Sequence, residues 1–272
     1  MTIFQAVFLG ALQGATELFP LSSLGLTVVL PRLLGFGDVT GNPEFLPFVV
    51  ALHLGTLIAL LVALAPEWWE VAASLGPGPQ TPARREGRLL ILLLVLASIP
   101  VGILGLAFQH KVQALFTAPA AAGVFLVLNG LIMAVGEKLR RASSTRKLGE
   151  LKPWDAMWMG LAQSLALLPG LSRSGVTLTA GLLRGLSHEA AARFTFLMAV
   201  PAIGAASILE LRHLHGGAHG LLGLAVLGGV ISAVVAYLSA RYLLRYFGRH
   251  GNLYPFAVLS GALGLLALIV TV

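Results

Sequence analysis

The stretch LQGATELFPLSSLGLT, residues 12–27, gathers polar side chains inside a region that is otherwise apolar. Gln13 and Glu17 are four residues apart, so on a helix they project from the same face, one turn apart. Pro20 and Gly25 interrupt this helix on either side of Ser22 and Ser23. A short apolar segment, a polar break and a second short segment predict a broken or re-entrant helix, which is tolerated at membrane depth only inside protein or beside a polar cavity.

The composition is that of an integral membrane protein. Of the 272 residues, 57% are hydrophobic and 11% are charged, where soluble domains carry roughly 25% charged residues. The chain has no cysteine, which excludes disulfides, thiolate metal sites and a cysteine nucleophile. The amino-terminal MTIFQAVFLG has no basic residue, so we expect no removable signal peptide.

Long apolar runs without strand-type alternation predict membrane-spanning helices. The expected spans are residues 46–65, 89–108, 119–136, 190–209, 220–240 and 253–271. The net charge of +7 is concentrated between them, in three groups of basic residues. These groups are Arg84, Arg85 and Arg88; Lys138, Arg140, Arg141, Arg146, Lys147 and Lys152; and Arg241, Arg245 and Arg249. Because they flank spans, we expect cytoplasmic loops that contact membrane lipids, and no nucleic acid partner.

The chain repeats itself on either side of its most hydrophilic segment. A shift of 150 residues sets GALQGATELFPLSSLGLT over GLAQSLALLPGLSRSGVT, so that Gln13 meets Gln163, Ser22 meets Ser172 and Thr27 meets Thr177. Three expected spans separate the copies, and this odd number would place the second copy upside down. The predicted fold is an all-α helical bundle in one membrane domain, residues 1–272. Its inverted repeats are about 1–136 and 154–272, joined by a basic linker at 137–153, and each contains a broken helix.

The second copy carries a pattern suited to phosphate. In PGLSRSG, residues 169–175, Arg173 stands between Ser172 and Ser174, immediately before a segment that can form a helix. A guanidinium, serine hydroxyls and the free N–H groups of a helix N-terminus all bind phosphate oxygens. The alternative for Arg173 is an ion pair with Glu17, which a phosphate ligand could displace.

Glu17 is the only carboxylate in its apolar region, and a charge at membrane depth is costly enough to indicate function. Its alternative is a carboxylate that reaches the interface. His53 stands alone in the span FVVALHLGTLIALL, where it is either a proton carrier or a hydrogen-bonded packing residue. The segment LRHLHGGAH, residues 211–219, could bind a metal ion, although it lacks a fixed spacing of ligands.

These motifs resemble those of the bacterial undecaprenyl-diphosphate phosphatases of the bacitracin-resistance type. QGATELFPLSS matches that family's first signature and PGLSRSG its second, and LHLGT at 52–56 and FTFLMAVP at 194–201 are also similar. The resemblance implies hydrolysis of undecaprenyl diphosphate, which recycles the lipid carrier of cell-wall precursors. It also implies an inner-membrane location, a site open to the periplasmic face, and a divalent cation, Mg²⁺ or Ca²⁺. The expected partners are the polyprenyl diphosphate and membrane lipids, with a homodimer left open.

The resemblance also assigns roles to individual residues. Glu17 and Gln13 would orient the attacking group or hold the cation, and Ser23 stands where a nucleophile is expected. His53 is a further catalytic candidate. The residues expected to bind the diphosphate are Ser22, Ser172, Arg173, Ser174, Gly175 and Thr177.

Two positions depart from the family pattern. Leu26 stands where the first signature usually has a histidine, and Ser260 where some members have a late arginine. Leucine has no proton to transfer, so the histidine's duty must be lost, reassigned or unnecessary. Two alternatives to an active phosphatase therefore stay open: a lipid-phosphate transporter without hydrolysis, and a catalytically weakened member of the family.

Overall fold

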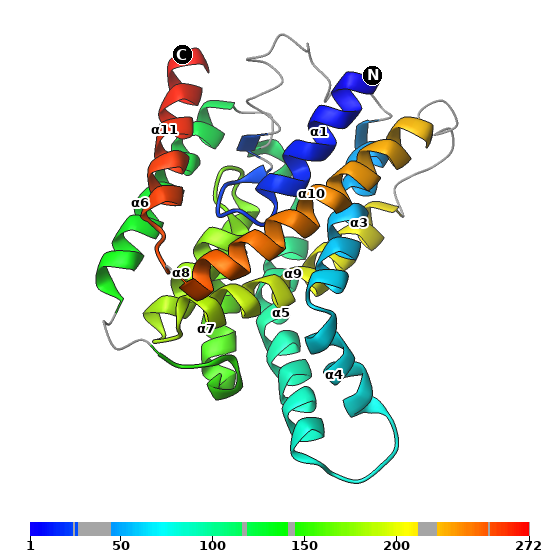
Figure 1. The fold of residues 1–272 in the computed structure, drawn as a ribbon. Helices are drawn as coiled ribbons and strands as arrows, with labels where there is room; N and C mark the ends of the chain where they lie inside the picture. The colour runs from blue at the N-terminus through cyan, green and yellow to red at the C-terminus, as the bar shows by residue number, and fades with distance from the viewer. Residues whose placement is uncertain are drawn as a thin grey trace.

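The computed structural model describes residues 1–23, 25–26, 45–115, 119–140, 145–211, 222–249 and 251–271. These residues form an assembly of helices (Figure 1). All six expected spans coincide with helices: α3 (Phe45–Ala63), α5 (Pro82–Leu115), α6 (Pro119–Leu139), α9 (His188–Leu211), α10 (Leu222–Arg249) and α11 (Tyr254–Thr271). The all-α prediction is therefore confirmed.

The first and last expected spans differ from the prediction in detail. After α3 the chain bends by 80° at Leu64 and continues as α4 (Ala65–Leu75). Pro66 lies in the first turn of α4, where its missing N–H is not needed, so it favours a new helix over continuation of the old one. Within the described residues, four helices are long and apolar enough to span a membrane, and the bent pair is a fifth candidate. The apolar part of α11, Tyr254–Val270, is shorter than these helices.

Each half of the chain opens with a short helix that ends at a break. In the first half α1 (Ile3–Thr16) ends before Pro20, and in the second α7 (Pro153–Ser164) passes through a short 3₁₀ turn, η2 (Leu165–Leu167), before Pro169. At 1.5 Å per residue, α1 and α7 are about 20 Å long, which is too short to cross a hydrocarbon core of about 30 Å. The second break is followed by α8 (Arg173–Leu183).

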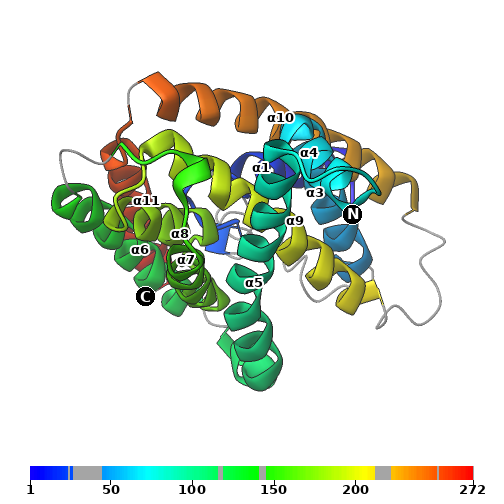
Figure 2. The same ribbon diagram turned by 90° about the horizontal axis from the view of Figure 1, so that it is seen from below.

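The two short helices pack reciprocally on long helices of the opposite half. Gly10 of α1 lies against the backbone of Gly228 in α10, and Gly160 of α7 lies against the backbone of Ala97 in α5. A Cβ at Gly10 or Gly160 would come within 2.6 or 2.3 Å of the facing carbonyl oxygen, so these contacts require glycine. In Figure 2, α6 and α11 lie together at one end of the molecule and α8 lies toward its middle. This reciprocal packing is consistent with two structurally equivalent halves. The inverted orientation of one half relative to the other stays a prediction.

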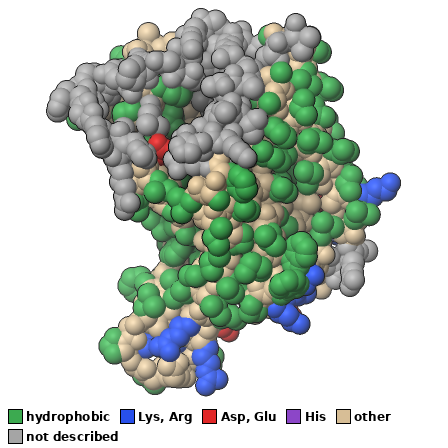
Figure 3. Space-filling view, turned by 180° about the vertical axis from the view of Figure 1, so that it is seen from behind, with side chains coloured by type: hydrophobic (Ala, Val, Ile, Leu, Met, Phe, Trp, Pro, Cys, Tyr) green, Lys and Arg blue, Asp and Glu red, His purple; other side chains and the backbone are tan. Residues whose placement is uncertain are grey.

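The surface supports a membrane location. Apolar side chains cover much of the described part of the face in Figure 3, and the basic side chains gather mainly toward its lower part. In Figure 1 the start of α5, which carries Arg84, Arg85 and Arg88, and the segment before α7, which carries Arg146, Lys147 and Lys152, lie toward the same lower end. The chain is therefore a multi-pass membrane protein with a basic end.

Candidate active site

The two polar breaks meet in the interior and share one local geometry. Ser172 caps α8 because its Oγ accepts from the Gly175 N–H at 3.2 Å, and the Ser22 Oγ accepts from the Gly25 N–H at the same distance. The Ser22 Oγ also accepts from the Gly170 N–H at 3.1 Å, which joins one break to the other. Gly170 has a φ of +111°, and a Cβ there would lie 2.4 Å from the Ala122 carbonyl oxygen, so only glycine fits.

Glu17 is the centre of the polar network at this junction. Its Oε2 accepts from Gln13 Nε2 and from Ser23 Oγ, both at 2.9 Å. Its Oε1 accepts from Arg173 Nη2 at 2.7 Å. The two side chains of this ion pair are 9% and 13% exposed, so solvent screens the pair little. The ion pair with Glu17 that the sequence left open as the alternative for Arg173 is present in this arrangement.

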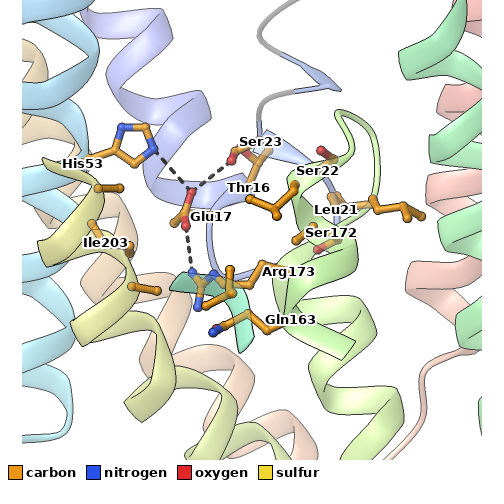
Figure 4. Close-up of a pocket in the computed structure, with 16 residues that line it drawn as sticks. Thr16, Glu17, Leu21, Ser22, Ser23, His53, Gln163, Ser172, Arg173 and Ile203 are labelled. Atoms are coloured by element: carbon orange, nitrogen blue, oxygen red, sulfur yellow. Dashed lines mark hydrogen bonds and ion pairs between the residues drawn. The ribbon is translucent and has the colours of Figure 1, made fainter. Parts of the chain in front are cut away.

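A cavity of about 180 Å³ opens beside this pair. It has room for several water molecules or for a small anionic group. Its polar lining comes from both halves of the chain and includes Glu17, Ser22, Ser23, His53, Gln163 and Arg173. Figure 4 shows these side chains around the cavity, with Glu17 between His53 and Arg173. Two segments far apart in the sequence therefore build one site.

His53 approaches Glu17 from α3. Its Nδ1 lies 2.9 Å from the Val49 carbonyl oxygen, a contact that requires a hydrogen on Nδ1. Nε2 then faces the Glu17 Oε2 at 3.9 Å, and in the neutral ring it carries the lone pair. The imidazole is thus anchored on one side and presents a proton acceptor to the site on the other.

Of the remaining residues predicted to bind phosphate, one lines the cavity and three make contacts within the protein. Ser172 lines the cavity together with Arg173. The Ser174 Oγ donates to the Phe19 carbonyl oxygen at 2.9 Å, and the Thr177 Oγ1 donates to the Arg173 carbonyl oxygen at 2.7 Å. Gly175 packs against Asn129, whose Oδ1 a Cβ would approach to 2.9 Å. These three residues hold the second break in shape, and their direct contact with phosphate stays a prediction.

Asn129 is a supporting residue that the motif analysis missed. Its Oδ1 accepts from the Ser172 N–H, and its Nδ2 donates to the Pro20 carbonyl oxygen and to the Ser260 Oγ, all at 3.0–3.1 Å. One buried amide therefore fixes both breaks. The signal in the sequence was a single asparagine inside an apolar span. Ser260, at the position of the family's arginine, donates to the Leu126 carbonyl oxygen and supports Asn129.

Leu26 does not face the site. It is 3% exposed and packs in an apolar cluster with Leu21 and Leu126. It is not among the residues that line the cavity. The match of Thr27 with Thr177 and the histidines of LRHLHGGAH fall outside the described residues.

Oxygen atoms at the site suit a hard cation, but in the described part of the chain there is no cluster of three or more His, Asp or Glu side chains. Among the described residues, Glu17 supplies the one carboxylate that lines the cavity. A Mg²⁺ ion commonly binds one or two carboxylates and completes its shell with substrate phosphates and water. The donor set therefore fits a cation that is held partly by the ligand.

Comparison with known proteins places the chain among close relatives. The family described as "Bacitracin resistance protein BacA" matches residues 6–266. A protein of Acidiphilium cryptum (strain JF-5) named undecaprenyl-diphosphatase is 46% identical, over 99% of this chain and 98% of its own length. Proteins of the same name from Granulibacter bethesdensis and Gluconacetobacter diazotrophicus are 42% and 43% identical, over 98% and 96% of this chain and 96% and 95% of their own lengths.

Proposed function

This chain belongs to the family of the bacitracin resistance protein BacA, and we propose that it hydrolyses undecaprenyl diphosphate to undecaprenyl phosphate and inorganic phosphate. The observation that carries the proposal is the junction of the two signatures, in which Glu17 bonds to both Ser23 and Arg173 at one cavity. The relatives named undecaprenyl-diphosphatase share nearly the whole chain. They do not favour a transporter without hydrolysis.

Arg173 is the main diphosphate contact in this proposal. Its Nη1 is buried without a partner among the described residues, while its Nη2 holds Glu17. A diphosphate can therefore bind Nη1 directly and compete with Glu17 for the rest of the guanidinium. The N-terminus of α8, where Arg173 lies, adds a positive dipole.

Ser23 is the attacking group in the mechanism that we propose. Diphosphate binding draws Arg173 away from Glu17, and Glu17 is then free to accept the proton that Ser23 already donates toward it. The Ser23 Oγ bonds to the terminal phosphorus, the bond to the bridging oxygen breaks, and undecaprenyl phosphate leaves. Water then attacks the phosphoserine and releases inorganic phosphate.

His53 supplies the imidazole of the site in place of a histidine at position 26. Its Nε2 lies 3.9 Å from the Glu17 Oε2, on the side of Glu17 opposite Arg173 (Figure 4). We propose that it receives the proton from Glu17 and passes it to the leaving undecaprenyl phosphate, and that it later accepts a proton from the attacking water and returns it to the Ser23 Oγ. In this proposal His53, on α3, takes the acid–base role that the resemblance assigns to a histidine at position 26.

A divalent cation, Mg²⁺ or Ca²⁺, is part of the same proposal. Glu17 and the Gln13 amide oxygen would hold it together with diphosphate oxygens, and its chemistry would be to neutralise phosphate charge. The test is phosphate release from farnesyl diphosphate by the purified protein, with and without a chelator. Release that is lost with chelator and restored by Mg²⁺ or Ca²⁺ is expected, and no release at any cation concentration would refute the proposed hydrolysis.

The location that we propose is the bacterial inner membrane, with the basic end cytoplasmic and the cavity open to the periplasmic face. The absence of cysteine makes this testable, because a cysteine in place of Gln80, in the exposed α4–α5 connection, would be unique. In intact cells it should resist a membrane-impermeant maleimide and react after permeabilisation. Labelling of intact cells would reverse the orientation.

A further inference from the structure

Gln163 is a buried polar residue that the mechanism has not used. It lies in the last turn of α7, is 1% exposed and lines the cavity. Neither its Nε2 nor its Oε1 has a hydrogen-bond partner among the described residues. Buried amides are costly when unpaired, so a side chain in this state indicates a missing ligand.

Its counterpart in the first repeat shows why Gln163 is unpaired. Gln13 donates to Glu17, four residues further along the chain. Four residues after Gln163 the chain has Leu167, which also lines the cavity but accepts no hydrogen bond. The second repeat therefore keeps the amide and lacks the carboxylate that would satisfy it.

Arg173 provides a second, independent sign of a ligand at the same place. Its Nη1 is buried and unpartnered like the Gln163 amide. Figure 4 shows Gln163 close to Arg173, on the opposite side of the guanidinium from Glu17. Two donors that face one cavity without acceptors are suited to an anionic oxygen.

We propose that Gln163 binds the diphosphate group, with its Nε2 donating to a phosphate oxygen that Arg173 Nη1 also contacts. This inference rests on the proposed function for the identity of the anion. It divides the cavity into a donor side, formed by Arg173 and Gln163, and an acceptor side, formed by Glu17 and His53. The diphosphate then lies on the donor side, and attack comes from the side of Ser23.

The test compares Gln163→Met with the wild-type protein. Methionine is close to glutamine in shape but has no amide, so it removes the contact with little change in packing. The probes are farnesyl diphosphate for turnover and its non-hydrolysable methylene analogue for binding. We expect the analogue to bind about 10- to 100-fold more weakly, as for the loss of one hydrogen bond to a charged group. We also expect the melting temperature without ligand to rise, because an unpaired buried amide is gone.

Thr195→Val is the matched control. Thr195 is fully buried in α9, its Oγ1 also has no partner in the described structure, and it does not line the cavity. Replacing it should leave binding and turnover unchanged. A general effect of removing a buried polar atom would appear in both variants, whereas loss of a ligand contact appears only at Gln163.

Binding by Gln163→Met within twofold of the wild type would overturn the proposal. If that variant does not fold, Gln163→Glu decides, because a carboxylate beside Arg173 Nη1 should repel the diphosphate and abolish binding of the analogue. Unchanged binding by Gln163→Glu would equally overturn it. Wild-type protein that binds the analogue but releases no phosphate would refute the hydrolysis alone and leave the Gln163 contact in place.

Discussion

The two breaks share a scaffold and differ in the chemistry that they carry. Ser22 and Ser172 make the same cap to Gly25 and Gly175 at the same distance. Glu17 of the first repeat corresponds to Leu167 of the second, and Ser23 corresponds to Arg173. The halves thus retain the residues that shape the backbone and divide the acceptor and donor groups between them. Neither break alone has a complete site.

The largest effect is expected from Arg173→Ala, which removes the charged donor of the second break. Diphosphate binding should weaken by at least 100-fold, and the stranded Glu17 carboxylate should lower the free energy of unfolding by about 3–5 kcal/mol. Titration with the methylene analogue and denaturant unfolding in micelles measure the two effects. Arg173→Lys, which keeps the charge but loses the two-pronged geometry, should bind at an intermediate level. Unchanged binding by Arg173→Ala would show that the anion site lies elsewhere.

The next effect concerns which residue provides the imidazole. His53→Gln should lower kcat by about 100-fold, the lower end of the range for a general acid or base, with a smaller change in KM. Leu26→His should bring no gain and should lower the free energy of unfolding by about 1–3 kcal/mol, because Leu26 packs among apolar side chains. Steady-state kinetics of the two variants and of their combination provide the measurement. Recovery of activity when Leu26→His is added to His53→Gln would contradict the assignment to His53.

Much of this fold follows from hydropathy and from the repeat. Apolar runs predicted the helices. The breaks were predicted by residues that act locally on the backbone, namely Pro20, Gly25, Pro169 and Gly170. The ion pair between Glu17 and Arg173 was foreseen only as an alternative to phosphate binding by Arg173. The bend at Leu64 escaped prediction because the apolar run continues to the bend, so hydropathy alone does not mark it.

The site was predictable only in part, because a sequence pattern does not say which partner a polar group takes. The sequence did not reveal that the Ser174 and Thr177 hydroxyls donate to nearby carbonyl groups, and their contact with phosphate stays a prediction. Leu26 stands where the resemblance places a histidine, and only the structure shows that its side chain faces an apolar cluster. Asn129 joins segments more than 40 residues away on either side, a relation that only the packing of the helices reveals.

A smaller effect separates the two serine caps. Ser172→Ala should lower the free energy of unfolding by about 1 kcal/mol, as for the loss of a typical N-cap. Ser22→Ala should cost about 1 kcal/mol more, because the Ser22 Oγ also accepts from the Gly170 N–H of the other break. Denaturant unfolding under one set of micelle conditions compares them directly. Equal costs would mean that the link between the breaks contributes nothing to stability.

The smallest effect concerns the first turns of α1 and α7, which are capped in a similar way. The Gln5 Oε1 accepts from the N–H of Thr2, and the Asp155 Oδ2 accepts from the N–H of Lys152, so a side chain in the first turn caps both helices. Only α1 adds the reverse bond, from the Gln5 N–H to the Thr2 Oγ1. Asp155 differs because it is charged, is fully buried and pairs with Arg146 and Arg184 at 2.7 and 2.8 Å. It lies outside the candidate spans. Only the second start should therefore respond to pH.

The direction of that response follows from the pKa of Asp155. Burial raises this pKa, but hydrogen bonds from Arg146 and Arg184 outweigh burial and leave it below the ordinary value of 3.8. The ion pairs therefore stabilise the fold at every pH above about 4 and are lost only as the pH falls through the lowered pKa. Asp155→Asn should reduce the melting temperature at pH 7 and flatten its dependence on pH below 4, whereas Gln5→Ala should lower it equally at all pH values. An acid response that survives in Asp155→Asn would place the titrating group elsewhere in the chain.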